Sequence, residues 1–160
     1  MIFFDRLIKT ASFLSSFSLV LLVVLVVYDA LMRYFFSQGS IAIQEFQWHL
    51  FDVVILFSIA YTMHHNAHVR VDIFYDNFSQ RVKNIINLAS LILFITPLSL
   101  LIIYVGFEFV SISFSQMECS SNPGGLSYRY IVKALMPIAF IFVLLQSVRE
   151  ILINIKELRV

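Results

Sequence analysis

Long apolar runs separated by short polar segments dominate this chain of 160 residues. Four of the runs are long enough to cross a bilayer core of roughly 30 Å, which takes about 20 helical residues. They cover residues 13–34, 46–63, 85–109 and 134–155. The pattern predicts an all-α integral membrane protein, with four transmembrane helices in one membrane domain over residues 1–160.

The segments between these runs differ in character. The first and third connections, near residues 35–45 and 115–130, are short and are predicted to be ordered loops. The second connection, near residues 69–84, repeats apolar side chains at a spacing of three to four against charged ones. This spacing predicts an amphipathic arm in the headgroup plane or against a partner, with Ser79 as the N-cap of the third span. The candidate arm residues are His68, Arg70, Asp72, Phe74 and Phe78.

Composition supports the membrane class. Hydrophobic residues make up 60% of the chain and charged residues 13%, and the mean hydropathy is +0.89. A soluble domain is closer to half apolar and a quarter charged. A net charge of +1 argues against a nucleic-acid partner, which would require a clustered basic face. The single cysteine, Cys119, can form no internal disulfide and has no second thiolate for a metal site.

The distribution of lysine and arginine predicts the orientation. Eight of these residues lie in the N-terminal segment, the second connection and the C-terminal segment, and three flank the first and third connections. This bias places both termini and the second connection in the cytoplasm. The first run is too long for a signal-peptide core and lacks a small-x-small cleavage site, so we expect it to be a retained first span.

A polar stripe marks the start of the second span. Glu45, Trp48, His49 and Asp52 are spaced i, i+3, i+4, i+7 and therefore share one helical face. A charged side chain in hydrocarbon costs about 2.5 to 3.5 kcal/mol on insertion scales. The stripe is therefore expected to contact other residues of the bundle or another subunit.

Further ionisable residues lie within the spans. Asp29 and Arg33 form an i, i+4 pair with the acid first, which is the favourable order. Arg33 and Glu45 flank the same loop, so we also expect an ion pair between the first two helices. Glu108 lies in the third span. Pro97 in the same span predicts a kink, which is tolerable if a nearby hydroxyl group, such as that of Thr96 or Ser99, bonds to the freed backbone carbonyl. These groups could satisfy one another within the bundle or form a polar seam for another subunit.

The residues that would carry chemistry form no catalytic pattern. The sequence has no phosphate-binding glycine loop, nucleophile elbow or paired catalytic carboxylates. The histidines, His49, His64, His65 and His68, all belong to the second span or its end. Haem ligation across a bundle needs imidazoles on facing helices, which these four residues do not provide. For His64, His65 and His68, a cluster in contact with solvent and headgroups is favoured over a metal site. We therefore expect that the protein has no catalytic, cofactor-binding or metal-binding residues and is not an enzyme.

Two segments together resemble a known family. Residues 45–79 contain the element His68–Asp72 (HVRVD), and residues 118–129 read ECSSNPGGLSYR, followed by LMP at 135–137. In these elements, and in Arg33 before an acidic Glu45, the chain resembles the small membrane subunit of tripartite ATP-independent periplasmic (TRAP) transporters, the DctQ-like family. The resemblance covers nearly the whole chain.

The resemblance implies a scaffold and docking subunit in the bacterial inner membrane. Its implied partners are a large TRAP membrane subunit, which binds the coupling sodium and the substrate, and a periplasmic binding protein that delivers an organic acid. No cofactor is implied for this chain itself. The alternative that stays open is a membrane anchor of a redox complex, and a free-standing small carrier is disfavoured because no broken helix marks a midplane site. The candidate docking loop comprises Glu118, Pro123, Gly124, Gly125 and Arg129.

Overall fold

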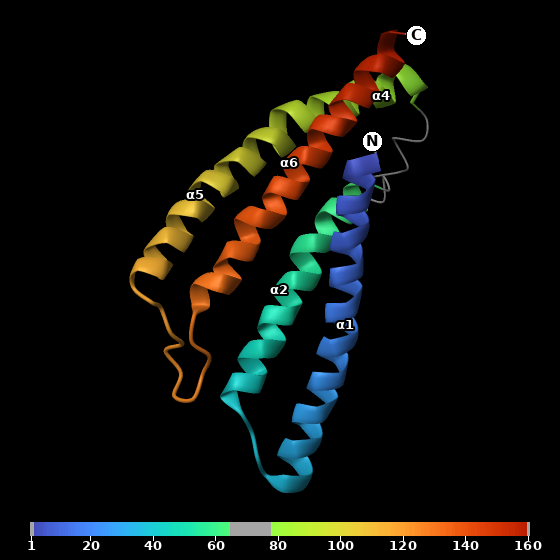
Figure 1. The fold of residues 1–160 in the computed structure, drawn as a ribbon. Coiled ribbons are helices and arrows are strands. Elements are labelled where there is room, and N and C mark those ends of the chain that lie inside the picture. Colours follow the sequence, from blue (N-terminus) through green and yellow to red (C-terminus); the bar gives the residue numbers. More distant parts are fainter. Residues whose placement is uncertain (1, 65–77, 160) are drawn as a thin grey trace.

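The computed structural model of the protein describes residues 2–64 and 78–159. Its elements are α1 (Ile2–Phe36), α2 (Ile41–His64), α4 (Gln80–Ser90), the π-helix η1 (Leu91–Ile95), α5 (Thr96–Ser115) and α6 (Arg129–Arg159) (Figure 1). The elements α4, η1 and α5 follow one another without a break. Four stretches are long and apolar enough to cross a membrane, namely Ile8–Phe36, Ile41–Met63, Gln80–Ser115 and Arg129–Leu158. The predicted all-α, four-span fold is confirmed.

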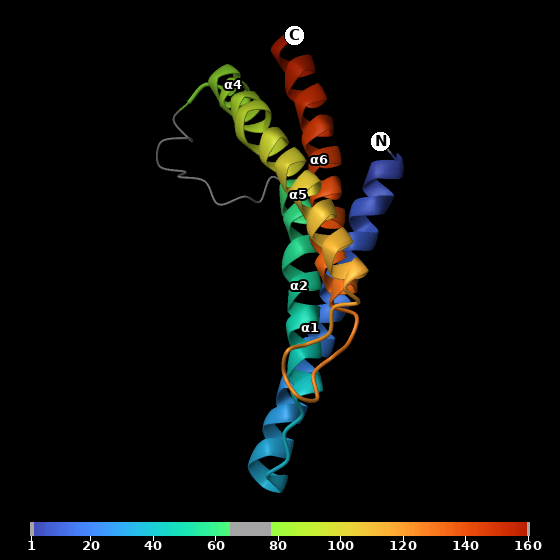
Figure 2. The ribbon, with the colours of Figure 1, turned by 90° about the vertical axis from the view of Figure 1, so that its left-hand side faces the viewer.

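The four long helices stand in a row and do not close into a bundle. α1 packs on α2, α2 packs on α6, and α6 packs on α5, so α1 and α5 form the two flanks (Figures 1 and 2). The N- and C-terminal ends lie at one end of the row, which we call the terminal end. The connections over residues 37–40 and 116–128 lie at the opposite end, the loop end. Which side of the membrane each end faces stays a prediction.

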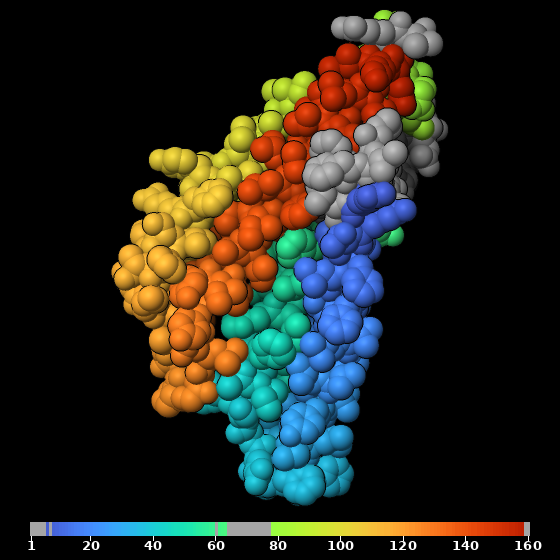
Figure 3. Space-filling view, viewed as in Figure 1, coloured from blue at the N-terminus to red at the C-terminus, as the bar shows by residue number. Residues whose placement is uncertain are grey.

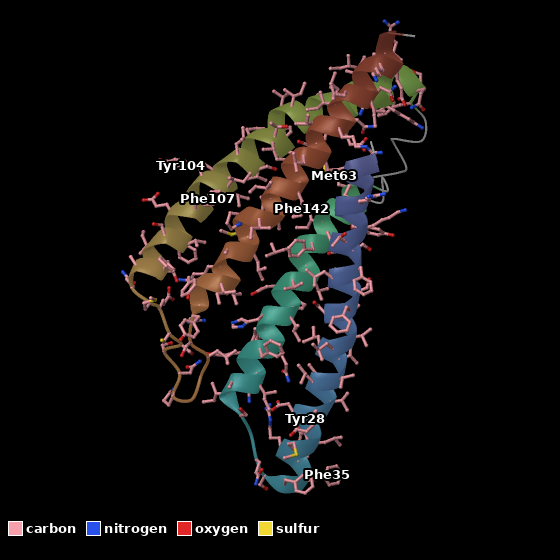
Figure 4. The ribbon with its side chains drawn as sticks, viewed as in Figure 1. Tyr28, Phe35, Met63, Tyr104, Phe107 and Phe142 are labelled. Atoms are coloured by element: carbon pink, nitrogen blue, oxygen red, sulfur yellow. The ribbon has the colours of Figure 1, made fainter. Side chains whose placement is uncertain are left out.

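The row has little interior of its own. Its core cluster, formed by Met63, Leu91 and Val143, lies where α2, η1 and α6 meet; Met63 and the neighbouring Phe142 are marked in Figure 4. Many large apolar side chains are exposed instead, among them Phe13 at 72% and Leu93 at 65%. In a bilayer these side chains meet lipid tails, so their exposure fits a membrane protein.

Small and polar residues form the seam between α1 and α2. Ala11, Ser15 and Ser18 are buried on α1, and the Ser15 hydroxyl donates a hydrogen bond of 3.0 Å to the Val54 carbonyl. Nearer the loop end, the side-chain amide of Gln47 donates one of 3.0 Å to the Leu25 carbonyl. Small residues let membrane helices approach closely and so gain dispersion contacts that lipid cannot replace.

A second small-residue seam joins α5 to α6. Ser99, Gly106 and Ser113 are buried on α5 at intervals of seven residues, and they face a helix whose Pro137 is fully buried. A Cβ atom on Gly106 would lie 3.2 Å from the Pro137 Cβ. The two backbones therefore pass so closely that glycine is the residue that fits without displacing its neighbour.

The expected irregularity at Pro97 takes the form of a π-helix. Pro97 stands in the first turn of α5, immediately after η1. Proline has no N–H to donate, and its ring presses on the carbonyl four residues earlier, so a wider turn accommodates it. The nearby hydroxyl groups do not bond to the carbonyl four residues before Pro97. The Ser99 hydroxyl donates a hydrogen bond of 2.7 Å to the Ile95 carbonyl, and the Thr96 hydroxyl lies 3.4 Å from the Ser147 hydroxyl.

The predicted amphipathic arm lies mostly outside the described residues, which exclude His68, Arg70, Asp72 and Phe74. Phe78 is described and exposed. Ser79 occupies the N-cap position of α4 as predicted, without a side-chain capping bond. In the second turn of α4, Asn84 is buried and donates a hydrogen bond of 3.0 Å to Glu157 of α6.

Candidate functional site

The 116–128 loop is an ordered structure built on a tight turn. The Gly125 N–H donates a hydrogen bond of 3.0 Å to the Asn122 carbonyl, Pro123 follows Asn122, and Gly124 has a φ of +80°. Proline second and a left-handed glycine third are the signature of a type II turn. The Ser120 N–H donates a hydrogen bond of 3.0 Å to the Leu126 carbonyl and so joins the two segments of the loop on either side of the turn. The predicted ordered turn is confirmed.

Glu45, at the beginning of α2, holds this loop. Its carboxylate accepts a hydrogen bond of 2.7 Å from the Leu126 N–H, one of 3.2 Å from the Asn122 side chain, and a third from the Ser120 hydroxyl. A Cβ on Gly125 would overlap Ser120 and lie 2.8 Å from the Glu45 carboxylate. Glycine at position 125 therefore leaves the space that the carboxylate occupies.

A second carboxylate, Glu118, ties the loop to α5 and α6. It pairs with Lys133 of α6 and accepts a hydrogen bond of 2.6 Å from the Ser113 hydroxyl of α5. The Lys133 ammonium also lies 4.0 Å from the centre of the Phe109 ring, a cation–π distance. The hydrogen bond from Lys133, followed by that from Ser113, holds the pKa of Glu118 below its ordinary value.

This lowered pKa predicts an acid-sensitive loop. A carboxylate whose pKa is lower in the folded state stabilises that state above its unfolded pKa of about 4.3, and the contribution is lost as pH falls through the folded value. We expect the emission of Trp48, the one tryptophan of the chain, to be steady above about pH 5 and to change below about pH 4. Lys133→Met should move this transition to higher pH, because it removes the first cause of the lowered pKa. A transition at the same pH in both proteins would contradict the assignment.

A cleft opens beside the loop, between α2 and α6. Its volume is about 560 Å³, and in the space-filling view a notch separates the beginning of α6 from α2 (Figure 3). The whole predicted stripe lines it, with the loop and α6 opposite. The polar lining residues are Gln44, Glu45, Trp48, His49, Asp52, Asn122, Arg129 and Lys133.

The charges on the two walls of the cleft are complementary. Acidic Glu45 and Asp52 project from α2, and basic Arg129 and Lys133 from α6. Within the described part of the chain, the side chains of His49 and Asp52 have no hydrogen-bond partner. Polar groups at a membrane helix face are normally paired with protein or lie in water. The cleft is thus a polar surface at the loop end that is suited to contact with water or another molecule.

The predicted pair of Asp29 and Arg33 forms within α1, and Asp29 is buried there at 5% exposure. The predicted ion pair between Arg33 and Glu45 is wrong. Arg33 is taken by the acid one turn earlier on its own helix, and Glu45 is taken by loop residues 75 to 81 positions away. The closeness of Arg33 and Glu45 in the sequence therefore does not produce an ion pair, because each side chain has another partner nearby.

The remaining candidates fall into two groups. Among the loop candidates, Glu118 anchors the loop to α5 and α6, and Gly125 leaves space for the Glu45 carboxylate. Pro123 and Gly124 form the turn, and the Arg129 side chain lines the cleft. The histidine cluster at residues 64–68 lies outside the described side chains. Among the side chains that are described, no three His, Cys, Asp or Glu residues come together to hold a metal ion. Sequence reasoning missed the partners of the two carboxylates, namely Ser113, Ser120, Asn122, Leu126 and Lys133.

These features define a class of protein: a membrane protein of four spans whose polar groups build a loop and a cleft at one end. The family described as "Tripartite ATP-independent periplasmic transporters, DctQ component" matches residues 22–157. The chain belongs to this family, and is the small membrane subunit of a TRAP transporter in the inner membrane. The family is a transporter component and not an enzyme family. The family match supports the transporter subunit over the alternative of a redox-complex anchor.

A named relative agrees with this assignment. The chain is 24% identical over 139 residues to a protein of Haemophilus influenzae named "Putative TRAP transporter small permease protein". The match covers 87% of this chain and 83% of the relative. The two proteins are therefore similar over nearly their whole lengths, and membership of the family implies that the chain works in a complex with other TRAP components.

Proposed function

We propose that this chain is the stationary scaffold and docking subunit of a sodium-coupled TRAP transporter that takes up an organic acid. A large membrane subunit would bind sodium and the substrate, and a periplasmic protein would deliver the substrate. The proposal is supported chiefly by the 116–128 loop, which Glu45 and Glu118 hold in a fixed shape at one end of the row. A preorganised loop loses little conformational entropy when a partner binds, so it is a suitable docking surface.

Reconstitution tests the function. Proteoliposomes that contain this chain and the large subunit, supplied with the binding protein and a labelled organic acid, should accumulate the acid under an inward sodium gradient. Leaving out any one of the three proteins, or replacing sodium by potassium, should remove at least nine-tenths of the uptake. Uptake by this chain alone, or undiminished uptake without it, would overturn the proposal.

The docking role needs a variant that changes the surface of the loop and leaves its anchors in place. Ser121 lies at the exposed tip, so Ser121→Arg should lower uptake several-fold while the large subunit is recovered with the chain as before. Gln38→Arg adds the same charge at the exposed loop over residues 37–40 and serves as the matched control. Equal uptake by both variants and the parent would reduce the 116–128 loop to a structural turn.

A further inference from the structure

The outer flank of α5, on the side opposite α6, carries a stripe of exposed residues that becomes polar toward the loop end. The buried residues Ser99, Gly106 and Ser113 face α6, and Tyr104 projects from the opposite side of the helix (Figure 4). Positions on that opposite side recur at intervals of four and three residues, and all of them are exposed. The stripe comprises Pro97, Leu101, Tyr104, Glu108, Ser111 and Ser115. Its half toward the loop end is entirely polar or amphipathic.

The other flank of the row provides an internal comparison. On α1, the residues that face α2 are Ala11, Ser15 and Ser18, and the opposite side again recurs at intervals of four and three. This second stripe comprises Phe13, Phe17, Val20, Val24, Val27 and Leu31, which are all exposed. Every one of them is apolar, so lipid tails can cover the flank of α1 at no cost. Lipid tails cannot satisfy the flank of α5 in the same way.

Glu108 is the residue that most needs a partner. It lies seven residues inside the loop-end terminus of α5, which is about 10 Å along the helix axis at 1.5 Å per residue. Over residues 2–64 and 78–159, no side chain forms a hydrogen bond or an ion pair with Glu108. Among the described cations at this end, Arg129 and Lys133 belong to α6 and line the cleft on the other side, and Arg33 belongs to α1 and pairs with Asp29. A carboxylate that faced lipid at this depth would be costly.

We propose that the outer stripe of α5 is the surface on which a transmembrane helix of the large TRAP subunit packs, with a basic side chain of that helix facing Glu108. This inference rests on the proposed function for the identity of the partner. Charge complementarity favours a cation on the partner, because Glu108 is acidic and residues 2–64 and 78–159 provide no ion-pair partner for it. The small hydroxyl residues Ser111 and Ser115 allow a close approach of the partner's backbone, as on the other side of the same helix.

A spin-label experiment tests the surface. Replacing Cys119, the one cysteine of the chain, by serine gives a background in which single cysteines can be labelled. Ser111→Cys reports on the stripe of α5, and Val24→Cys, on the stripe of α1, is the matched control. The accessibility of each label to oxygen is measured in bilayers, first for this chain alone and then after assembly with the large subunit.

We expect the label at residue 111 to lose oxygen accessibility several-fold on assembly and the label at residue 24 to keep it. If the large subunit is recovered with the chain but the label at residue 111 stays accessible, the inference is wrong and the proposed function stands. If the label becomes protected in the chain alone as the protein-to-lipid ratio is raised, the partner is a second copy and the inference is again wrong. Failure to recover the large subunit with the unlabelled parent chain would instead contradict the proposed function.

The charge is tested separately. Glu108→Gln keeps the shape of the side chain, and Glu108→Lys places a cation opposite the proposed cation. Recovery of the large subunit with the tagged chain should fall several-fold for Glu108→Gln and at least tenfold for Glu108→Lys, with unchanged helical circular dichroism showing that each variant folds. Equal recovery for both variants and the parent would overturn the assigned role of Glu108.

Discussion

Replacing Glu45 by alanine is expected to release the 116–128 loop from α2. The carboxylate accepts hydrogen bonds from the Leu126 N–H, the Asn122 amide and the Ser120 hydroxyl, and alanine accepts none of them. Bonds to an ionised acceptor are roughly twice as strong as neutral ones. The amide hydrogens of residues 120, 125 and 126 should therefore exchange at least about tenfold faster than in the parent, because opening of the loop becomes more frequent.

Two further variants sharpen this experiment. Glu45→Gln retains one acceptor oxygen and loses the other, so its loop amides should exchange at intermediate rates. Gln44→Ala removes the neighbouring side chain, which lines the same cleft, and should leave the loop amides unchanged. If the proposed docking role is right, uptake should decrease in the same order as loop protection. Unchanged exchange at residue 126 in Glu45→Ala would show that the loop holds its shape without the carboxylate.

The four spans could be predicted from the sequence because each is a long apolar run, and hydropathy follows the bilayer thickness directly. The helix partners could not be predicted in the same way. In a membrane, the side that packs on protein and the side that meets lipid are both apolar, so the packing seam gives no periodic signal. The seam of α1 depends on Ala11, Ser15 and Ser18, which lie among other small residues of the same span.

The polar groups show where sequence reasoning reached its limit. The stripe from Glu45 to Asp52 was predicted from helical spacing, and the structure places all of it on one cleft. The partner of Glu45 was not predictable, because it is a loop backbone 81 positions away. Glu108 could be recognised as an intramembrane acid from the sequence. The side of α5 that it occupies became visible only once Ser99, Gly106 and Ser113 were seen to face α6.

Gly106→Leu is expected to separate α5 from α6 and to cause a large loss of stability. The first added carbon alone would lie 3.2 and 3.3 Å from the Cβ and Cδ of Pro137 and 3.4 Å from the Met136 side chain. Pro137 is rigid and fully buried, so it cannot rotate away. Overpacking of a well-packed contact costs about 1–3 kcal/mol and occasionally more, and here the leucine adds three carbons beyond the Cβ.

The thermal midpoint of the detergent-purified chain, followed by the loss of its monodisperse peak, measures this effect. Val105→Leu is the matched control, because it enlarges an adjacent and exposed side chain of the same helix; its midpoint should equal that of the parent. Gly106→Ala should lie between the two, since its single carbon requires a shift of only a few tenths of an ångström and alanine favours the helix by about 1 kcal/mol over glycine. Equal midpoints for Gly106→Leu and Val105→Leu would mean that the close approach of α5 and α6 does not hold the subunit together. The expected order, by contrast, would show that the seam at Gly106 keeps α5, and with it the stripe around Glu108, fixed against the rest of the row.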